Sequence, residues 1–188
     1  MPCIGQDARA ALEAADAGAY GVIYADPPWT YGNPTPNADP AQQYDVMDLL
    51  AICGLPVARV AAKDSVLYLW ATAPLLSEGL RVLESWGFEY KTSAVWDKER
   101  LGVGYWWRTS HELLLVGTRG HVSPPPQELR VSSVIRQRRA EHSQKPDDVR
   151  RWLCDWFPDA RRLEIFARTI APGWDCIGNE SAKQTLLL

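Results

Sequence analysis

The sequence predicts an α/β fold in which helices cover both faces of a mostly parallel, doubly wound sheet. Short, β-prone apolar runs at 22–25, 65–71 and 162–167 are typical of buried parallel strands. Between such runs, apolar residues recur at the helical period, most clearly in 75–86 and 149–156. Strands and helices are therefore expected to alternate along the chain. We expect one domain over residues 1–188, because a domain usually has about 100–200 residues.

Turn and cap residues indicate where each element begins and ends. Gly87 stands where a helix C-cap glycine belongs, and Pro146 with two acidic residues behind it marks a helix start. Asp45 or Asp48 is a candidate cap for a helix that runs to about Ala62. In order, we expect a short helix within 1–19, a strand at 22–25, the helix to about 62, a strand at 65–71, a helix at 75–86, strands at 88–97, 112–117 and 131–135, a helix from 146 to 157, and strands at 162–167 and 174–177.

Composition argues against several functional classes. The formal net charge is -3, so no overall positive charge attracts nucleic acid, and any such contact needs a local patch. The cysteines show no Cys-x-x-Cys pair and no histidine partner at zinc spacing, so we expect reduced thiols and no metal. Residues 1–11 lack the cationic start of a signal peptide, and no apolar run approaches the ~20 residues of a membrane span. We therefore expect a soluble intracellular protein with no membrane partner.

The segment Asp26-Pro27-Pro28-Trp29 ends the first strand abruptly. Each proline fixes its own φ and restrains the residue before it, so a carboxylate, two carbonyls and an indole are held rigidly at the carboxyl end of a strand. Ligands bind at this end of the strands in open α/β sheets. The alternative is a simple turn with a packed tryptophan, because Asp and Pro are ordinary turn residues.

These groups suit chemistry on the exocyclic amine of a nucleobase. Such an amine is a poor nucleophile, because its lone pair is conjugated into the ring. The Asp26 carboxylate and the Pro27 carbonyl are candidate acceptors for its two hydrogens, and such hydrogen bonds draw the nitrogen toward a tetrahedral, reactive shape. The indole of Trp29 is a candidate for stacking on the base, an interaction worth about 1–3 kcal/mol on comparable platforms.

From Tyr20 to Glu180 the chain resembles the MT-A70 family of S-adenosylmethionine-dependent N6-adenine methyltransferases. Besides the motif at Asp26, its markers appear in this order: Leu67-Tyr68-Leu69-Trp70, Trp86-Gly87-Phe88, Lys145-Pro146, Leu163 to Arg168, and Gly173-Trp174 to Glu180. The resemblance implies a Rossmann-like methyltransferase fold with permuted motif order, in which the catalytic motif precedes the cofactor motif. The strands at 22–25 and 163–167 are then expected to be neighbours in the sheet.

The resemblance also implies S-adenosylmethionine as the cofactor. The sequence has no glycine-rich phosphate loop, which argues against a P-loop NTPase or a dinucleotide enzyme. By family match, Lys145 pairs with the carboxylate of the cofactor. The other members of the expected cofactor-binding set are Asp26, Phe166, Arg168, Thr169, Asn179 and Glu180.

The expected substrate-binding set combines the loop at 100–110 with residues implied by the family. Interleaved basic and aromatic residues in that loop are a pattern that grips single-stranded nucleic acid, although such a loop also packs its own rings. By family match a tyrosine and a glutamate lie close to the target base, with a structural anchor and a surface strand end as the alternatives. Two arginines before Lys145 are candidates for phosphate contacts, although a charge run is usually just solvated. The set is Trp29, Tyr44, Trp106, Trp107, Arg108, Glu112, Arg138 and Arg139.

Together these features predict an enzyme that methylates the N6 amine of adenine in nucleic acid, with Asp26, Pro27, Pro28 and Trp29 as its catalytic residues. DNA is favoured over RNA as the substrate. The alternative is a non-catalytic subunit that presents nucleic acid within a methyltransferase heterodimer. We expect the protein in a prokaryotic cytoplasm or that of a phage-infected host, and assembly as a homodimer or a heterodimer stays open.

Overall fold

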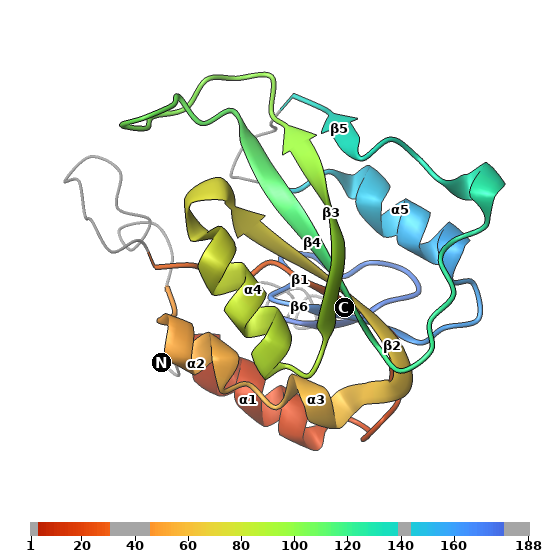
Figure 1. Cartoon of the computed structure of the whole chain (residues 1–188). Helices are drawn as coiled ribbons and strands as arrows, with labels where there is room; N and C mark the ends of the chain where they lie inside the picture. Colours follow the sequence, from red (N-terminus) through yellow and green to blue (C-terminus); the bar gives the residue numbers. More distant parts are fainter. Residues whose placement is uncertain (1–3, 31–45, 139–143, 179–188) are drawn as a thin grey trace.

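The computed structural model describes residues 4–30, 46–138 and 144–178. These residues form one seven-stranded sheet with the strand order β5-β3-β4-β2-β1-β6-β7 (Figure 1). β1 lies in the interior of the sheet, where it is hydrogen-bonded to β2 on one edge and to β6 on the other. The strands are β1 (Tyr20–Ala25), β2 (Ala61–Thr72), β3 (Glu89–Asp97), β4 (His111–Arg119), β5 (Val134–Arg136), β6 (Arg162–Ile165) and β7 (Asp175–Ile177).

All of these strands except β4 run in the same direction, so the prediction of a mostly parallel sheet is confirmed. β4 is antiparallel to both of its neighbours, with pairs such as Thr72↔Glu112 and Asp97↔His111. The expectation that strands and helices alternate throughout is wrong at this point. The chain passes from β3 to β4 through a loop without a helix, and a direct connection of this kind joins antiparallel strands.

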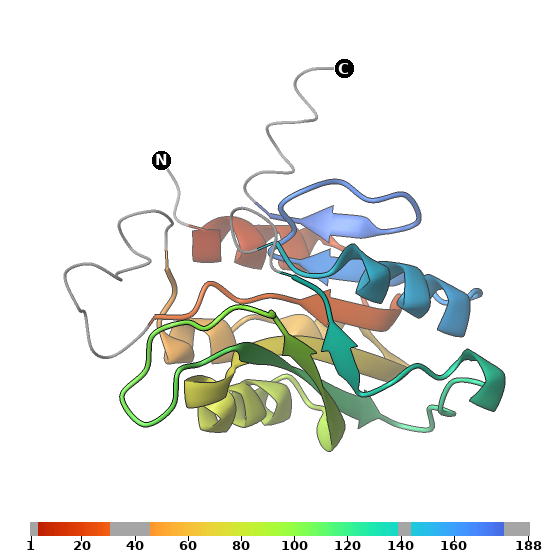
Figure 2. The ribbon, with the colours of Figure 1, turned by 90° about the horizontal axis from the view of Figure 1, so that it is seen from above.

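Helices pack on both faces of the sheet. On one face, helices α1 to α4 bury residues such as Leu12, Ile52 and Leu83 against β1, β2, β4 and β6. On the other face, α5 buries Val149 and Leu153 against an aromatic-rich layer. Figures 1 and 2 show α4 and α5 on opposite sides of the sheet. The helices are α1 (Ile4–Ala14), α2 (Leu49–Cys53), α3 (Val57–Val60), α4 (Leu76–Ser85) and α5 (Asp147–Trp156).

The described part of the chain contains no helix of the length and apolarity that crossing a bilayer requires.

The helix predicted to run to about Ala62 is wrong in its length. Asp48 does cap it, because its carboxylate accepts a hydrogen bond from the Ala51 amide at 2.7 Å, but α2 ends at Cys53. Pro56 follows, and proline disfavours the helical conformation in the residue before it. Only the short helix α3 forms before β2 begins at Ala61, ahead of the predicted start of that strand.

The end of α4 is confirmed. Gly87 adopts a φ of 84°, in the left-handed region that favours glycine after a helix. The Phe88 amide donates to the carbonyl of Leu83 at 3.1 Å, which closes the last turn. This cap turns the chain directly into β3.

β1 and β6 are parallel neighbours, as the resemblance implies, with Ala25 paired to Ile165. In the sheet, β2, β4, β3 and β5 lie in this order on one side of β1, and β6 and β7 lie on the other. The chain completes the first side before it returns to add β6 and β7. The strand order therefore reverses at β1. In open α/β sheets such a reversal opens a crevice outside the carboxyl ends of the strands, and ligands bind there.

A buried carboxylate lies in β6. Glu164 is 5% exposed, and its Oε2 accepts no hydrogen bond. Nε of Arg150 forms an ion pair with this atom at 3.3 Å, but the guanidinium directs a hydrogen bond to Oγ1 of Thr169, at 3.3 Å. Burial raises the pKa of Glu164 to about 7; Arg150 offsets part of this effect, while Asp26 and Asp147 add to it.

The raised pKa of Glu164 predicts that its contribution to the free energy of unfolding becomes less favourable as the pH rises. Because the pKa of Glu164 is about 7 in the folded state and near 4.5 ordinarily, ionisation destabilises the fold progressively between these two values. Below them the side chain is protonated in both states. At about pH 8, Glu164→Gln should therefore raise the free energy of unfolding by about 2 kcal/mol over that of the parent protein, with little difference at about pH 4.5.

Urea denaturation at both pH values measures the effect. Glu128→Gln, which changes an exposed glutamate, is the matched control and should show no such pH dependence. A gain from Glu164→Gln that is equal at both pH values would contradict the assigned ionisation.

Candidate active site

Asp26 follows β1 directly, and hydrogen bonds fix the backbone around it. Its own amide donates to a carbonyl of β6 at 3.4 Å. The Trp29 amide donates to the Pro27 carbonyl at 2.9 Å, and the Met47 amide donates to the Pro28 carbonyl at 2.9 Å. The segment is therefore a rigid turn at the carboxyl edge of the sheet, at the position where the strand order reverses.

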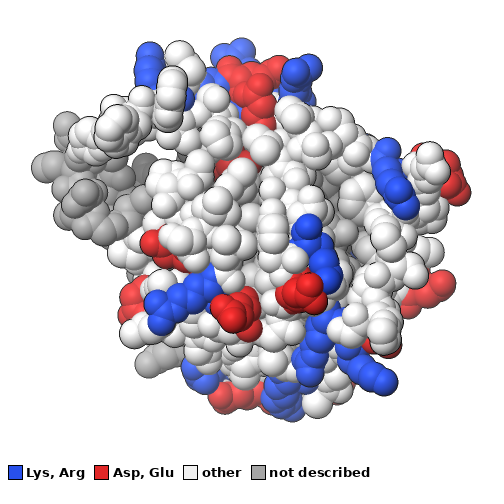
Figure 3. Space-filling view, in the orientation of Figure 1, with Lys and Arg blue, Asp and Glu red and all other residues white. Residues whose placement is uncertain are grey.

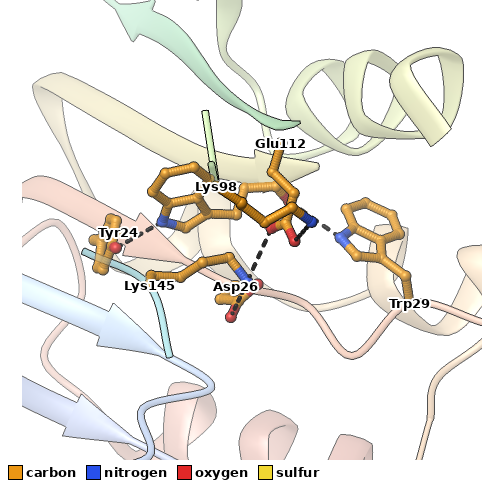
Figure 4. A network of polar contacts seen from close by, with 7 residues as sticks. Tyr24, Asp26, Trp29, Lys98, Glu112 and Lys145 are labelled. Atoms are coloured by element: carbon orange, nitrogen blue, oxygen red, sulfur yellow. Dashed lines mark hydrogen bonds and ion pairs between the residues drawn. The ribbon is translucent and has the colours of Figure 1, made fainter. Parts of the chain in front are cut away.

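The carboxylate of Asp26 is paired with Lys145, which lies 119 residues further along the chain. Nζ of Lys145 donates to both carboxylate oxygens, at 2.7 Å each. The two side chains are only 12% and 21% exposed, for Lys145 and Asp26 respectively. Figure 4 shows the lysine reaching the Asp26 carboxylate across the end of β1. The residue predicted to bind the carboxylate of the cofactor is thus held by the motif predicted to be catalytic.

Glu112, at the start of β4, joins this pair. Its Oε2 lies 3.3 Å from Nζ of Lys145, and its Oε1 accepts a hydrogen bond from Lys98 at 3.0 Å (Figure 4). The Glu112 side chain is 12% exposed, so the alternative of a surface strand end is wrong. Lys98 escapes the sequence reasoning, although its position directly after the carboxyl end of a strand is the signal that would have indicated it.

Burial and ion pairing act in opposite directions on these groups. Burial alone would lower the pKa of Lys145, but the carboxylates of Asp26 and Glu112 outweigh it and raise this pKa above its ordinary value. Burial alone would raise the pKa of Glu112, but Lys145 and Lys98 hold it below its ordinary value. Both groups therefore stay charged near neutral pH, as buried ions do only when they are paired.

Aromatic side chains from β1 and β2 frame the cluster. Nζ of Lys145 lies 5.7 Å from the centroid of the Trp70 ring, and Nε1 of Trp70 donates to the hydroxyl of Tyr24 at 2.6 Å. Nε1 of Trp29 donates to the Trp70 carbonyl at 3.1 Å, and Trp29 is 8% exposed. Trp29 is therefore anchored to the end of β2. The sequence places Trp70 in a buried strand and in a marker of the family resemblance, and its contact with the lysine is a finding of the structure.

The turn after β6 lies beside this cluster. Phe166 has a φ of 68°, which non-glycine residues rarely adopt, and the Ala167 amide donates to the carbonyl of Ile177 at 2.9 Å. A Cβ added to Gly178 would lie 2.1 Å from the carbonyl oxygen of Ala167, so only glycine fits there. The end of β7 thus holds the turn that leads into Arg168.

Of the other expected cofactor-binding residues, Arg168 is half-buried, and Thr169 is exposed and receives the hydrogen bond from Arg150. Asn179 and Glu180 lie outside the described residues. The structure therefore brings Asp26, Lys145 and the turn that begins at Phe166 to one edge of the sheet. This edge offers a cation and several acceptors to a polar ligand.

The loop between β3 and β4 projects beyond the same edge (Figure 1). Its two arms are joined by a hydrogen bond from the Gly102 amide to the Thr109 carbonyl at 2.8 Å, and Nε of Arg108 donates to the Gly102 carbonyl at 3.2 Å. Trp106 and Trp107 at its tip are 94% and 85% exposed. The alternative in which this loop packs its own rings is therefore wrong.

Of the three remaining residues predicted to contact the substrate, the structure describes only one. Arg138 is exposed just beyond β5, whereas Tyr44 and Arg139 lie outside the described residues.

On the face seen in Figure 3, basic and acidic side chains are interspersed rather than gathered into a patch of one sign. Within residues 4–30, 46–138 and 144–178, no group of three or more His, Cys, Asp or Glu side chains is placed to hold a metal ion.

Comparison with known proteins assigns the chain to a family. The sequence model of the MT-A70 family matches residues 20–180. The chain is 33% identical over 180 residues to the type II methyltransferase M.MunI of a Mycoplasma species, an alignment that covers 86% of this chain and 77% of that protein. It is 32% identical to an N(6)-adenosine-methyltransferase MT-A70-like protein of Arabidopsis thaliana and 27% identical to the human N(6)-adenosine-methyltransferase catalytic subunit METTL3. Those alignments cover 87% and 90% of this chain but only 24% and 29% of the two proteins. The chain therefore belongs to the MT-A70 family of methyltransferases.

Proposed function

We propose that the protein transfers a methyl group from S-adenosylmethionine to the N6 amine of an adenine in nucleic acid. The observation that carries the proposal is the Asp26 carboxylate, which is held beside two proline-fixed carbonyls where the strand order of the sheet reverses. Membership of the MT-A70 family supports methyl transfer, and the names of the adenosine methyltransferases among its relatives support the N6 amine as the acceptor.

Asp26 and Pro27 supply the acceptors that a target amine needs. Hydrogen bonds from its two hydrogens to the Asp26 carboxylate and the Pro27 carbonyl localise the lone pair on nitrogen, which conjugation otherwise withdraws into the ring. The Pro27 carbonyl already accepts from the Trp29 amide, and its second lone pair remains for a substrate. As the amine becomes cationic during the transfer, the negative charge of Asp26 stabilises it.

The donor set at this edge fits S-adenosylmethionine. The carboxylate of the cofactor needs a cation, which Lys145 supplies, and its amine and ribose hydroxyls need acceptors such as Asp26 and Thr169. When bound, the cofactor supplies an electrophilic methyl group. The residues of this chain position the amine for the reaction, and such positioning is worth about 7–11 kcal/mol. The rest of the proposed set is Phe166, Arg168, Asn179 and Glu180.

The substrate side is proposed to combine the turn, the cluster and the projecting loop. Trp106 and Trp107 expose their rings, so they offer stacking surfaces to unpaired bases, and Arg108 beside them offers charge to a phosphate. Near the target base we place Trp29, Tyr44 and Glu112, and along the strand Arg138 and Arg139. We favour DNA over RNA because M.MunI, a type II methyltransferase, suggests a DNA substrate and is matched over most of its length. The adenosine methyltransferases are matched over only about a quarter of theirs.

We propose that the protein acts in a prokaryotic or phage-infected cytoplasm, where its substrate polymer is found. The intact motif at Asp26 and its ion pair with Lys145 favour an enzyme over a subunit that only presents nucleic acid.

Transfer of label from S-adenosylmethionine tests the proposal directly. Purified protein is incubated with methyl-labelled cofactor and with matched single- and double-stranded DNA and RNA, and the product nucleosides are separated. We expect label in N6-methyladenine, with DNA as the better acceptor. Label in another base, or in none of the four polymers, would refute the proposed reaction.

Asp26→Ala should reduce turnover by about 100-fold or more, because it removes the charge and an acceptor that serve the transition state. The affinity for S-adenosylhomocysteine, measured by calorimetry, should change far less than turnover, because Lys145 and the turn after β6 supply most of the proposed cofactor contacts. Asp155→Ala, which removes an exposed carboxylate of α5, is the control and should leave both quantities unchanged. Turnover of Asp26→Ala at the parent rate would exclude the assigned role.

The double substitution Trp106→Ala with Trp107→Ala should weaken binding of single-stranded nucleic acid by about tenfold or more, because stacking is worth about 1–3 kcal/mol per base. Val103→Ala changes an 83% exposed residue of the same loop that has no ring, and it should bind like the parent protein. Fluorescence anisotropy with a labelled oligonucleotide measures both. Equal affinities for the two variants would remove these rings from the interface.

A further inference from the structure

The ammonium group of Lys145 faces three carboxylate oxygens within the cluster. Its Nζ lies 2.7 Å from each carboxylate oxygen of Asp26 and 3.3 Å from Oε2 of Glu112. An ammonium group has three hydrogens and no acceptor. Three carboxylate oxygens therefore surround the ammonium group of Lys145. A fourth carboxylate oxygen would have to share a hydrogen with one of these three, so a full-strength ion pair with another carboxylate requires that one of them be released.

Asp26 is engaged by the same ammonium group. Nζ lies 2.7 Å from both of its oxygens, so it sits between them, and the Asp26 side chain is only 21% exposed. Each oxygen keeps a lone pair, but a substrate amine that approaches this half-buried carboxylate meets the ammonium group there. Lys145 thus competes with the proposed substrate amine for Asp26.

We propose that Lys145 is a place-holder for the target amine, and that it passes from Asp26 to the carboxylate of the bound cofactor. The inference rests on the proposed function of the site. It assigns an order to binding: the cofactor comes first, Asp26 is released, and the base amine then binds to it. Lys145 in this way couples the two ligands although it contacts only the cofactor.

Glu112 makes the exchange feasible. Its Oε1 keeps the hydrogen bond from Lys98 at 3.0 Å, so Glu112 remains compensated whichever carboxylate Lys145 holds. The lysine side chain carries its charge on a flexible four-carbon stem, and it pivots about its contact with Glu112. In the competing arrangement, Lys145 stays on Asp26 permanently as a counter-ion, and binding of the cofactor has no effect on the amine.

The test compares two cofactor analogues that differ only in the carboxylate: S-adenosylhomocysteine and its decarboxylated form. The probe is a short labelled single-stranded oligonucleotide, as DNA and as RNA, with either adenine or unsubstituted purine at one position. Purine lacks the amine, so the ratio of the two affinities isolates the contact of interest. In the unmodified protein, S-adenosylhomocysteine should increase the adenine preference by about tenfold, and the decarboxylated analogue should not.

Lys145→Met removes the ammonium group but keeps the apolar stem, and thermal unfolding shows whether it folds. This variant should prefer adenine equally with either analogue or with none, and its affinity for S-adenosylhomocysteine should fall toward that for the decarboxylated form. Lys91→Met, which changes an exposed lysine paired with Glu89, is the matched control and should behave as the unmodified protein.

Equal enhancement by both analogues in the unmodified protein would overturn the inference, and so would an adenine preference that no analogue alters. Neither result requires the variant to fold. The readout is binding, so the outcomes separate from those of the proposed function. If the protein methylates adenine but the carboxylate of the analogue does not change the adenine preference, only the exchange by Lys145 is wrong. If the carboxylate changes the adenine preference but no methyl group is transferred, only the proposed reaction is wrong.

Discussion

The position of β1 in the interior of the sheet is the constraint on which the site depends. β2 and β6 satisfy the backbone of β1 on both edges, and helices cover both of its faces. The two ladders fix the register of the strand, with Ala25 paired to Leu69 on one side and to Ile165 on the other. Asp26 therefore has only one place, immediately beyond the strand. The other charged groups reach it from elements that the same sheet positions: Glu112 from β4, Lys98 after β3, and Lys145 before α5.

Desolvation explains why these groups form a cluster rather than a single pair. A buried ion that loses its partner destabilises a protein by about 3–5 kcal/mol, so each charge at this edge needs a counter-charge. Asp26, Lys145, Glu112 and Lys98 form an alternating chain in which every member is compensated. Buried ion pairs of this kind add little to net stability, but they define geometry. They hold the Asp26 carboxylate oriented before any substrate arrives.

Local signals were sufficient for some elements and not for others. The apolar run before Asp26, the helical stripe of α4 and the glycine after it each act over a few residues, so the carboxyl end of β1, α4 and the cap of α4 follow from the sequence. The direction of β4 depends on how the chain crosses from β3, which periodicity does not report. The contact of Asp26 with Lys145 joins residues 119 apart, and the family resemblance pointed to both residues but not to their pairing. Lys98 and Trp70 acquire their roles only from side chains on other strands. Pro56 is a local signal from which the end of α2 could have been predicted, but the apolar residues on both sides of it favoured one continuous helix.

The residues on either side of the segment 31–45 are bonded to each other next to the turn that follows Asp26. Oγ1 of Thr30 donates to the Met47 carbonyl at 2.9 Å, and Trp29 forms a parallel bridge with Met47. For a connection whose ends are already fixed, doubling the number of residues costs only about 0.6 kcal/mol of closure entropy. Insertions, deletions and exchanges between these anchors are thus cheap, and they leave the geometry of the Asp26 carboxylate intact. Evolution can therefore vary the length and sequence of this connection without disturbing the turn that holds Asp26.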